Sequence, residues 1–322
     1  MFTDRRRRAL RGVLAATAVS AAMAATAGTA FASGDPAGAA QRAQQQAQQQ
    51  AEQQAEQQAE LVQGAGRLAR AAGSVETPSF AMNAVDKQSS ELYMYFPNRQ
   101  GAFDDRYNVE VSFDAFADSI NVDNDKDGYS DGTWSLYKSG VLSYGWIDDQ
   151  LEYHSKNVGT AWNIYTTVLS PGSLGGAQEA DLIGLDKAGD LWGYLGNPDG
   201  TLGERTRIGG GWGQYTQLAG QGDLTGDGKA DIVARDKTGV LWLYRGTGDY
   251  KAPFAARTQV GGGWNTYDRL LSVGDLDADG RADLIARKPN GDLYRYSGTG
   301  DAGAVFQKPV KIGNGFQIYN LL

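Results

Sequence analysis

The sequence predicts an all-β fold, a five-bladed β-propeller, on three observations. First, two aromatic residues three positions apart recur five times, at intervals of 49, 50, 52 and 52 residues. A fixed period of this length indicates one supersecondary unit repeated around a ring or along a stack. Second, each repeat divides into four short strand-like segments. Third, the two ends of the repeat region are phased so that they would close a ring. The aromatic pairs are Phe113/Phe116, Trp162/Tyr165, Trp212/Tyr215, Trp264/Tyr267 and Phe316/Tyr319.

The four segments of a repeat are clearest after Trp264. An apolar run at 270–273 is followed by an acidic loop at 274–280, and the segments 282–287, 293–296 and about 305–312 complete the unit. These segments are rich in Val, Ile, Leu and Tyr and are bounded by Gly, Asp, Asn or Pro, which is typical of strands joined by tight turns. Four strands per unit is the organisation of a propeller blade. No segment of this region keeps the 3.6-residue apolar period of a helix, so we expect few helices.

The phasing of the ends favours a closed ring over an open stack of the same units. The repeat region opens at 79–85, which aligns with the second strand of a repeat, and ends at 317–322, which aligns with the first strand. We therefore expect the carboxyl-terminal strand to complete the blade that the amino-terminal strands begin. Such closure removes open sheet edges, which are prone to aggregation.

Three loops predict metal binding, because each places oxygen ligands at positions 1, 3, 5 and 9 around a glycine at position 6. Ca²⁺ takes six to eight oxygen ligands in irregular geometry, and the main-chain carbonyl at position 7 can supply one of them. The alternative is a solvated acidic turn that uses Asp and Gly only for turn geometry. Repulsion among the clustered carboxylates argues against it. The candidate ligands are Asp123, Asp125, Asp127, Tyr129 and Asp131, then Asp223, Thr225, Asp227, Lys229 and Asp231, then Asp275, Asp277, Asp279, Arg281 and Asp283.

We expect three structural Ca²⁺ ions that link the first strand of a blade to the second. Direct bridging of ligand hydroxyls by Ca²⁺ is the alternative role. The fourth loop, 173–181, keeps only the last carboxylate, Asp181, and is predicted to bind no ion. The fifth loop is interrupted by the ends of the repeat region.

The pattern Asp-x-(Asp/Thr)-x-Asp-Gly-x-x-Asp before a strand resembles the FG-GAP/VCBS-type repeat of secreted and cell-surface propellers. The element Ile-Gly-Gly-Gly-Trp-x-x-Tyr at 208–215 is similar to the repeats of tachylectin-2-like five-bladed lectins. Together the likeness covers about residues 79–322. It implies a Ca²⁺-binding propeller that recognises carbohydrate. The chain departs from the pattern at loop 173–181 and in the first repeat, which has Phe113 in place of Trp and no glycine cluster. Secreted actinobacterial propellers of this kind include lectin subunits of the umbrella toxin particles, which implies a targeting role in a larger assembly.

Aromatic residues near Asp, Asn and Gly suit sugar rings, because an aromatic plane covers the C–H face while polar groups hold the hydroxyls. Weak sites repeated around a ring would gain avidity on a polymer surface. The alternative role of each aromatic residue is packing between blades. The candidate ligand-binding residues are Trp162, Tyr165, Trp212, Tyr215, Trp264, Tyr267, Trp192 and Trp242.

The amino-terminal region predicts export. Residues 1–32 combine an arginine-rich start, an apolar alanine-dominated stretch and the small-x-small site Ala30-Phe31-Ala32, as in a secretory signal peptide cleaved near Ala32. The apolar stretch is shorter than the ~20 residues that span a bilayer, so no membrane span is predicted. The arginines leave Sec and Tat export both open. Residues 33–78 are an Ala/Gln-rich spacer, part helix and part disorder, or a helix that docks on a partner protein.

Composition argues against several function classes. The net charge of −8 would become −12 once cleavage removes five arginines and one aspartate, which disfavours nucleic-acid partners. The chain has no cysteine and one histidine, His154, for which we expect an exposed surface position. It contains no Gly-x-Ser-x-Gly nucleophile motif, and it lacks the usual zinc ligands.

The sequence therefore predicts a secreted, calcium-stabilised, non-enzymatic lectin of residues 79–322 that binds glycans on a cell surface or cell wall. A protein-interaction or adhesion propeller is the alternative. A carboxylate-based polysaccharide hydrolase is the third interpretation, because paired carboxylates leave little trace in a sequence.

Overall fold

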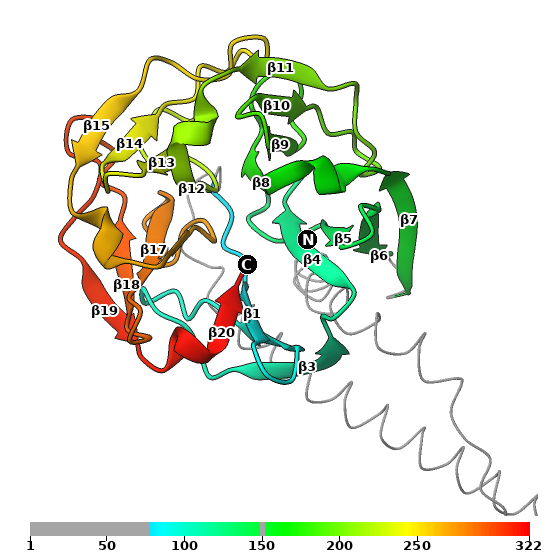
Figure 1. Cartoon of the computed structure of the whole chain (residues 1–322), viewed down its shortest axis with the longest axis horizontal. Coiled ribbons are helices and arrows are strands. Elements are labelled where there is room, and N and C mark those ends of the chain that lie inside the picture. The colour runs from blue at the N-terminus through cyan, green and yellow to red at the C-terminus, as the bar shows by residue number, and fades with distance from the viewer. Residues whose placement is uncertain (1–76, 149–151) are drawn as a thin grey trace, which may run out of the picture.

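The structure is a computed structural model that describes residues 77–148 and 152–322. The signal peptide predicted at 1–32 and residues 33–76 of the predicted spacer lie outside the described residues. Five four-stranded antiparallel sheets surround a central axis (Figure 1). The predicted five-bladed β-propeller is thus confirmed.

The strands follow one another from the axis outward in every blade. Blade 1 contains β4 (Phe116–Val122), β5 (Gly132–Tyr137), β6 (Leu142–Ile147) and β7 (Tyr153–Gly159). Blade 2 contains β8 (Tyr165–Gly172), β9 (Asp181–Asp186), β10 (Leu191–Tyr194) and β11 (Thr206–Gly209). Blade 3 contains β12 (Tyr215–Ala219), β13 (Ile232–Asp236), β14 (Leu241–Tyr244) and β15 (Thr258–Gly261). Blade 4 contains β16 (Arg269–Leu271), β17 (Asp283–Arg287), β18 (Leu293–Ser297) and β19 (Val310–Gly313). Blade 5 contains β20 (Tyr319–Leu321), β1 (Met82–Asp86), β2 (Glu91–Tyr95) and β3 (Tyr107–Ser112).

Blade 5 closes the ring with strands from both ends of the described chain. β20 pairs antiparallel with β1, in a register that places Ala84 opposite Leu321. The Leu322 N–H donates to the Asn83 carbonyl at 3.0 Å. The pairing supplies main-chain partners to two strands that would otherwise carry free edges. The closure predicted from the phasing of the repeats is therefore confirmed.

Four of the connections between blades contain one turn of helix. The glycine-rich runs lead into one turn of 3₁₀ helix: η1 (Trp162–Ile164), η2 (Trp212–Gln214), η3 (Trp264–Thr266) and η4 (Phe316–Ile318). The residue before each turn has a positive φ, between 62° at Ala161 and 84° at Gly211 and Gly263, which glycine adopts without steric cost. With three residues per turn, the two aromatic residues of a pair lie on the same side of the backbone.

The recurring aromatic pairs form the core between blades. In blade 2, Trp162 packs on Tyr194 of the third strand, with 4.5 Å between ring centroids. In blade 3, Trp212 packs on Tyr244 of the third strand, with 4.4 Å between ring centroids. The partner Tyr hydroxyls meet one another, at 2.5 Å for Tyr165 with Tyr194. Equivalent hydroxyl pairs occur in blade 3 at 2.5 Å and in blade 4 at 2.7 Å. Each buried hydroxyl thus has a partner, as burial of a polar group requires.

Blade 1 is joined to blade 2 by a tryptophan that the repeat does not contain elsewhere. Trp134 is 0% exposed, and its indole N–H donates to the Gly200 carbonyl at 2.9 Å.

We expect Trp134→Phe to lower the free energy of unfolding by about 2 kcal/mol, because it leaves a buried carbonyl without a donor and opens a small void. Denaturant unfolding measures this loss. The half-buried Trp146 of the same blade provides the control: if Trp146→Phe costs as much as Trp134→Phe, the interblade hydrogen bond is not the cause.

Candidate functional site

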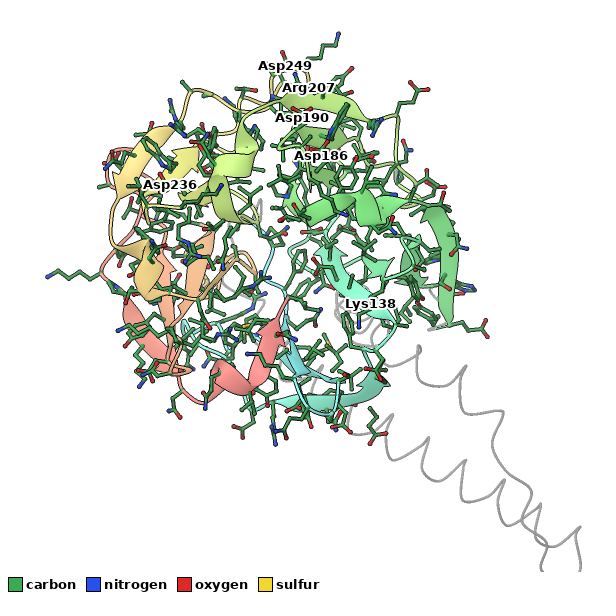
Figure 2. All side chains as sticks on the ribbon, viewed as in Figure 1. Lys138, Asp186, Asp190, Arg207, Asp236 and Asp249 are labelled. Atoms are coloured by element: carbon green, nitrogen blue, oxygen red, sulfur yellow. The ribbon has the colours of Figure 1, made fainter. Side chains whose placement is uncertain are left out.

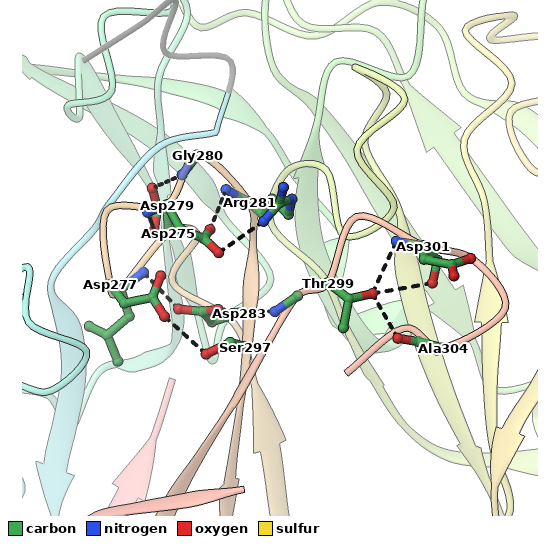
Figure 3. Close-up of polar contacts among 12 residues, drawn as sticks. Asp275, Asp277, Asp279, Gly280, Arg281, Asp283, Ser297, Thr299, Asp301 and Ala304 are labelled. Carbon is green, nitrogen blue, oxygen red and sulfur yellow. Dashed lines mark hydrogen bonds and ion pairs between the residues drawn. The ribbon is translucent and has the colours of Figure 1, made fainter. Parts of the chain in front are cut away.

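The three acidic loops each connect the first strand of a blade to the second. Loop 123–131 lies between β4 and β5, loop 223–231 between β12 and β13, and loop 275–283 between β16 and β17. We number each loop from 1 to 9. Figure 3 shows polar contacts of the third loop, where Asp275 accepts from the Gly280 N–H, Asp279 from Arg281 and Asp277 from Ser297.

The carboxylate at position 1 is held by main-chain donors of its own loop. Asp123 accepts from the Gly128 N–H at 2.8 Å, Asp223 from Gly228 at 2.6 Å, and Asp275 from Gly280 at 2.8 Å. The glycine at position 6 adopts a φ of 88°, 78° and 88° in the three loops. This left-handed conformation turns the chain back toward position 1, which is the reason a glycine stands there.

The oxygen atoms of positions 1, 3 and 5 converge. In loop 123–131 the oxygens of Asp123, Asp125 and Asp127 all lie within 4.8 Å of one another, and the same holds for Asp275, Asp277 and Asp279. In loop 223–231 the side-chain oxygen of Thr225 takes position 3, and this buried atom has no hydrogen-bond partner of good geometry among the described residues. Hard oxygen donors clustered in this way match the ligand preference of Ca²⁺.

Burial makes these carboxylates costly to ionise without a cation. Desolvation, opposed by the Gly128 N–H and reinforced by neighbouring carboxylates, raises the pKa of Asp123 to about 7. Desolvation, together with the charge of Asp277, raises the pKa of Asp283 to about 8. Desolvation likewise raises the pKa of Asp231 to about 6. A bound divalent cation would reverse the direction of these shifts, because it favours the charged form.

The aspartate at position 9 has a structural role in addition to any ligand role. In loops 173–181, 223–231 and 275–283 it accepts from the N–H of loop position 2 and from the N–H of the glycine that follows the third strand. The distances are 2.7 and 2.9 Å for Asp181, 3.1 and 2.8 Å for Asp231, and 3.0 and 3.2 Å for Asp283. Loop 173–181 lacks the other carboxylates yet keeps this arrangement. The isolated Asp181 is therefore explained by loop architecture, independently of metal.

In loop 275–283, two arginines lie against the acidic groups. Arg295 lies 3.0 Å from the Asp277 carboxylate, and Arg281 lies 3.2 Å from that of Asp279. Ser297 also donates to Asp277 at 3.0 Å. Part of the negative charge of this loop is therefore already compensated by protein cations.

The first described residues run between two of these loops. The Pro78 carbonyl accepts from the Asp275 N–H at 2.8 Å, and the Ser79 N–H donates to the Gly128 carbonyl at 3.1 Å. The backbone that enters the propeller is thus attached to loop 123–131 on one side and to loop 275–283 on the other. A change in the conformation of either loop would therefore also displace the entering segment.

Six of the eight aromatic residues predicted to bind a ligand lie in the core. Their exposed fractions are between 5% and 8%, for Trp162, Tyr165, Trp212, Tyr215, Trp264 and Tyr267. They pack against the neighbouring blade, so their ring faces are not accessible to a ligand in this structure. This is the packing role that the sequence left open as the alternative.

The two remaining candidates, Trp192 on β10 and Trp242 on β14, are half-buried and belong to a repeated arrangement. Each indole N–H donates to the aspartate that ends the preceding strand: Trp192 to Asp186 at 2.9 Å and Trp242 to Asp236 at 2.8 Å. Figure 2 labels these two aspartates, on blades 2 and 3.

An exposed arginine covers one face of each ring. The guanidinium carbon lies 4.4 Å from the ring centroid for Arg205 over Trp192, 4.0 Å for Arg257 over Trp242, and 4.8 Å for Arg106 over Tyr93 in blade 5. Arg106 also donates to the Tyr319 hydroxyl at 2.6 Å, and Arg257 donates to that of Tyr215. We call this arrangement the arginine–aromatic site.

These three arginines were not predicted to bind a ligand, although the sequence contains a signal for them. Arg106, Arg205 and Arg257 each stand seven positions before the first aromatic residue of the following pair, and the equivalent positions of the other two repeats are Ser155 and Pro309. Alignment of the repeats by their aromatic pairs would have revealed the recurrence.

A shallow cavity of about 570 Å³ lies beside the arginine–aromatic site of blade 5. Asp104, Asp105 and Arg106 line one side, and the loop around Asn314 that leaves blade 4 lines the other, with Tyr95 and Ile318 also at its surface. Carboxylates, a guanidinium, an amide and an aromatic ring are thus gathered at one junction between blades. This combination can hold a polyhydroxylated ligand through directed hydrogen bonds and ring contact.

The single histidine is engaged in a local contact. His154 Nε2 lies 2.7 Å from Asp148, and its ring stacks on Trp146 at 5.3 Å between centroids. With 40% of its side chain exposed, it occupies the surface position expected for it. None of the helices within residues 77–148 and 152–322 has the length and apolar character that a membrane crossing requires.

Family models match the region of the second and third acidic loops. Residues 223–286 match the FG-GAP-like repeat, and residues 269–306 match the FG-GAP repeat. The FG-GAP part of the resemblance in the sequence is therefore confirmed for these residues. A comparison with curated protein sequences finds no match.

Several solved propellers are similar in fold. The BP39L lectin from Burkholderia pseudomallei is 12% identical, with 71% of this chain and 68% of that chain covered and a TM-score of 0.44. A triple arginine-to-alanine mutant of AofleA from Arthrobotrys oligospora is 11% identical, with coverage of 74% and 73% and a TM-score of 0.43. Yeast RCC1 (Prp20), in a complex with Kap60, is 12% identical, with coverage of 70% and 57% and a TM-score of 0.34.

Proposed function

We propose that this protein is a carbohydrate-binding β-propeller that recognises glycans on a cell surface or cell wall through its arginine–aromatic sites, and that it does so without catalysis. The observation that carries the proposal is the recurrence of an exposed guanidinium over a half-buried ring at three equivalent positions: Arg106, Arg205 and Arg257. We expect export by the signal peptide predicted at 1–32, and a role as the targeting subunit of a larger secreted assembly.

The chemistry of the site supports a neutral or acidic sugar. The ring fixes the plane of the guanidinium, so its outer N–H groups are pre-oriented to donate to vicinal hydroxyls or to a carboxylate. At blade 5, Asp104 and Asp105 add acceptors for sugar hydroxyls beside the same guanidinium. Separate weak sites on different blades suit a polymer that engages several of them at once.

Ca²⁺ has a structural role in this proposal. The side chains of positions 1, 3, 5 and 9, with the main-chain oxygens of Tyr129, Lys229 and Arg281, would hold one ion in each of the loops 123–131, 223–231 and 275–283. The ion would neutralise the loop and connect the first strand of the blade to the second. The loops and the arginine–aromatic sites use different residues, so sugar binding does not require the ion to touch the ligand.

A glycan array followed by titration with the best hit tests the proposal. We expect Arg106→Ala and Arg257→Ala each to weaken binding about tenfold or more, because a lost charge-assisted hydrogen-bond pair costs about 1.5–3 kcal/mol. On an immobilised polymer the double variant is expected to lose more than either single variant, because avidity falls. Arg207→Ala is the matched control. Arg207 is also an exposed blade arginine, but its guanidinium pairs with Asp190 at 2.7 Å and is not stacked on a ring of the described residues (Figure 2).

Three outcomes argue against this function. The absence of any reproducible glycan hit, combined with a co-purifying protein, favours the protein-interaction propeller. If the wild type and both arginine variants bind the glycan with equal affinity, the sugar binds at another part of the protein. Release of reducing ends from a polysaccharide favours the hydrolase. Repetition of the array with a chelator, well below the unfolding temperature, separates a structural Ca²⁺ from one that bridges the sugar, since only the latter is needed for binding in the folded protein.

A further inference from the structure

The axis of the propeller contains a polar cavity that is separate from both the acidic loops and the arginine–aromatic sites. Its volume is about 180 Å³, and it is partly open to solvent. The innermost strands β4, β8, β12 and β16 surround it, together with the chain around β1 (Figure 1). This space can hold several water molecules or one small ligand.

The wall of the cavity carries charge at a position where the repeats diverge. Two residues after the second aromatic of each pair stand Asp118, Thr167, Gln217, Arg269 and Leu321. Asp118, Thr167 and Arg269 line the cavity. Every repeat keeps the aromatic pair, which packs the blades. The position two residues after the pair carries an acid, a hydroxyl, an amide, a base or a leucine. In blade 3, Gln217 at this position joins the main chain of blade 4, at Asp268 and Leu270, whereas Asp118 and Arg269 bring charge to the cavity.

Two wall groups have unmet hydrogen-bonding capacity. The Nε–H of Arg269 is shielded from solvent and has no hydrogen-bond partner in the described protein. The side-chain carbonyl oxygen of Asn83 is also shielded from solvent and has no hydrogen-bond partner in the described protein. Asn83 is only 5% exposed, and its side-chain N–H group donates to Ser119 at 3.4 Å. A buried polar group left without a partner destabilises the folded protein. The Arg269 Nε–H is therefore a donor that needs an acceptor, and the Asn83 side-chain oxygen is an acceptor that needs a donor.

The charged groups around the cavity fit an anion near Arg269. Burial lowers the pKa of Arg269, while the negative charge of Asp118 opposes this shift. Arg287 also lies within electrostatic range of Arg269, although its guanidinium is engaged by Asp268. Burial raises the pKa of Asp118 to about 6, against the attraction of Arg269. Asp118 can thus accept from, or after protonation donate to, a hydroxyl of a ligand.

We propose that the central cavity binds a small hydroxylated carboxylate, such as a sugar acid, with its carboxylate on Arg269 and its hydroxyl groups on Asp118 and Asn83. Arginine matches a carboxylate because its planar donors meet both oxygens. The Asn83 oxygen and the Asp118 carboxyl select a ligand that also carries O–H donors. This binding is independent of the glycan sites, because no residue is shared between them.

Calorimetric titration with glucuronate tests this inference, with glucose and acetate as the comparison ligands. We expect glucuronate to bind with a dissociation constant of about 1 mM or tighter, and glucose and acetate to bind at least about tenfold more weakly, a difference of about 1.4 kcal/mol. Glucose lacks the carboxylate, and acetate lacks the hydroxyl groups. Failure of glucuronate to bind, or equal binding of glucose, overturns the inference.

Variants then locate the ligand. Arg269→Gln is expected to weaken glucuronate binding at least about tenfold, whereas the surface control Arg207→Gln and the glycan-site variant Arg106→Ala are expected to leave it unchanged. Asn83→Asp keeps the size of the side chain and adds a negative charge. It is expected to weaken the binding of glucuronate more than the binding of glucose. Circular dichroism establishes that each variant is folded. Should Arg269→Gln not fold, Asn83→Asp decides the question alone. If both fold and bind as wild type does, the cavity holds only water.

Loss of glucuronate binding in Arg106→Ala but not in Arg269→Gln assigns the acid to the glycan site and overturns the inference while supporting the proposed function. The converse result supports the cavity whatever the glycan array finds. The two proposals therefore fail separately.

Discussion

Removal of Ca²⁺ is expected to destabilise the propeller by about 4 kcal/mol and to lower its unfolding temperature by about 10 °C. At about 1 mM Ca²⁺ and a dissociation constant of about 10⁻⁴ M, each ion adds about 1.4 kcal/mol to folding, and three sites are expected. The physical reason is that buried carboxylates such as Asp123 and Asp275 repel their neighbours until a cation lies between them. Calorimetric unfolding with Ca²⁺ and with excess chelator measures the effect.

The loop variants for this experiment follow from the hydrogen bonds of each position. Position 9 is unsuitable, because Asp231 and Asp283 also hold the strands together through the Gly246 and Gly298 N–H groups. Position 5 is better, so we expect Asp127→Asn, Asp227→Asn and Asp279→Asn each to reduce the bound Ca²⁺ by one ion. Glu179→Gln is the control, since it also removes one negative charge, at position 7 of loop 173–181, which is expected to bind no ion.

An unfolding temperature that does not respond to chelator, together with no Ca²⁺ uptake in calorimetry, would refute the metal assignment. Loop 275–283 already has Arg295 and Arg281 against its carboxylates. We therefore expect these two guanidinium groups to weaken the binding of Ca²⁺ in this loop.

Replacement of Arg287 by methionine is expected to lower the free energy of unfolding by about 3–5 kcal/mol. Arg287 is 6% exposed, on β17 of blade 4. Its guanidinium binds both carboxylate oxygens of Asp268 at 2.9 Å and donates to the carbonyls of Phe316 and Tyr319 at 3.1 and 2.6 Å. The variant removes one donor from each of two carbonyls next to the strand that closes the ring, of which the Phe316 carbonyl keeps the Tyr319 N–H, and it leaves the Asp268 carboxylate without its arginine.

Two further variants interpret that loss. Arg235 makes the same contacts from blade 3 to the carbonyls of Trp264 and Tyr267, so Arg235→Met is expected to cost a similar amount. Arg207→Met, whose guanidinium is exposed and pairs with Asp190, is expected to change stability by less than about 0.5 kcal/mol. Chemical denaturation provides all three values. If Arg287→Met costs no more than Arg207→Met, the arginine does not join the blades.

Most of the fold could be predicted from the sequence, because its signals are local and repeated. Alternating strand segments, glycine turns and the phase of 79–85 against 317–322 each have a direct physical meaning, and five copies reinforce them. The single turn of 3₁₀ helix after each glycine run was not predicted, because three residues are too few to show a period. The acidic loops could be found because their ligands lie within nine residues of one another.

The aromatic residues illustrate the limit of the sequence. Trp212 and Trp242 have the same chemistry and recur with the same period, yet one is enclosed between blades and the other is half-buried under Arg257. The period of the repeat indicates that both matter, but it does not indicate which face of a blade meets its neighbour. That distinction requires the angle and spacing between sheets.

The sequence by itself determined the repeating sheet, the closure of the ring and the composition of the acidic loops, since each depends on residues that are neighbours in the chain or one repeat apart. Only the tertiary structure decided which aromatic rings are exposed, which arginines join the blades, and that Asn83, Asp118 and Arg269 meet at the axis. Asn83 and Arg269 line one cavity although they stand 186 positions apart (269 − 83), and this geometry arises from the packing of five sheets around a common centre rather than from any local pattern.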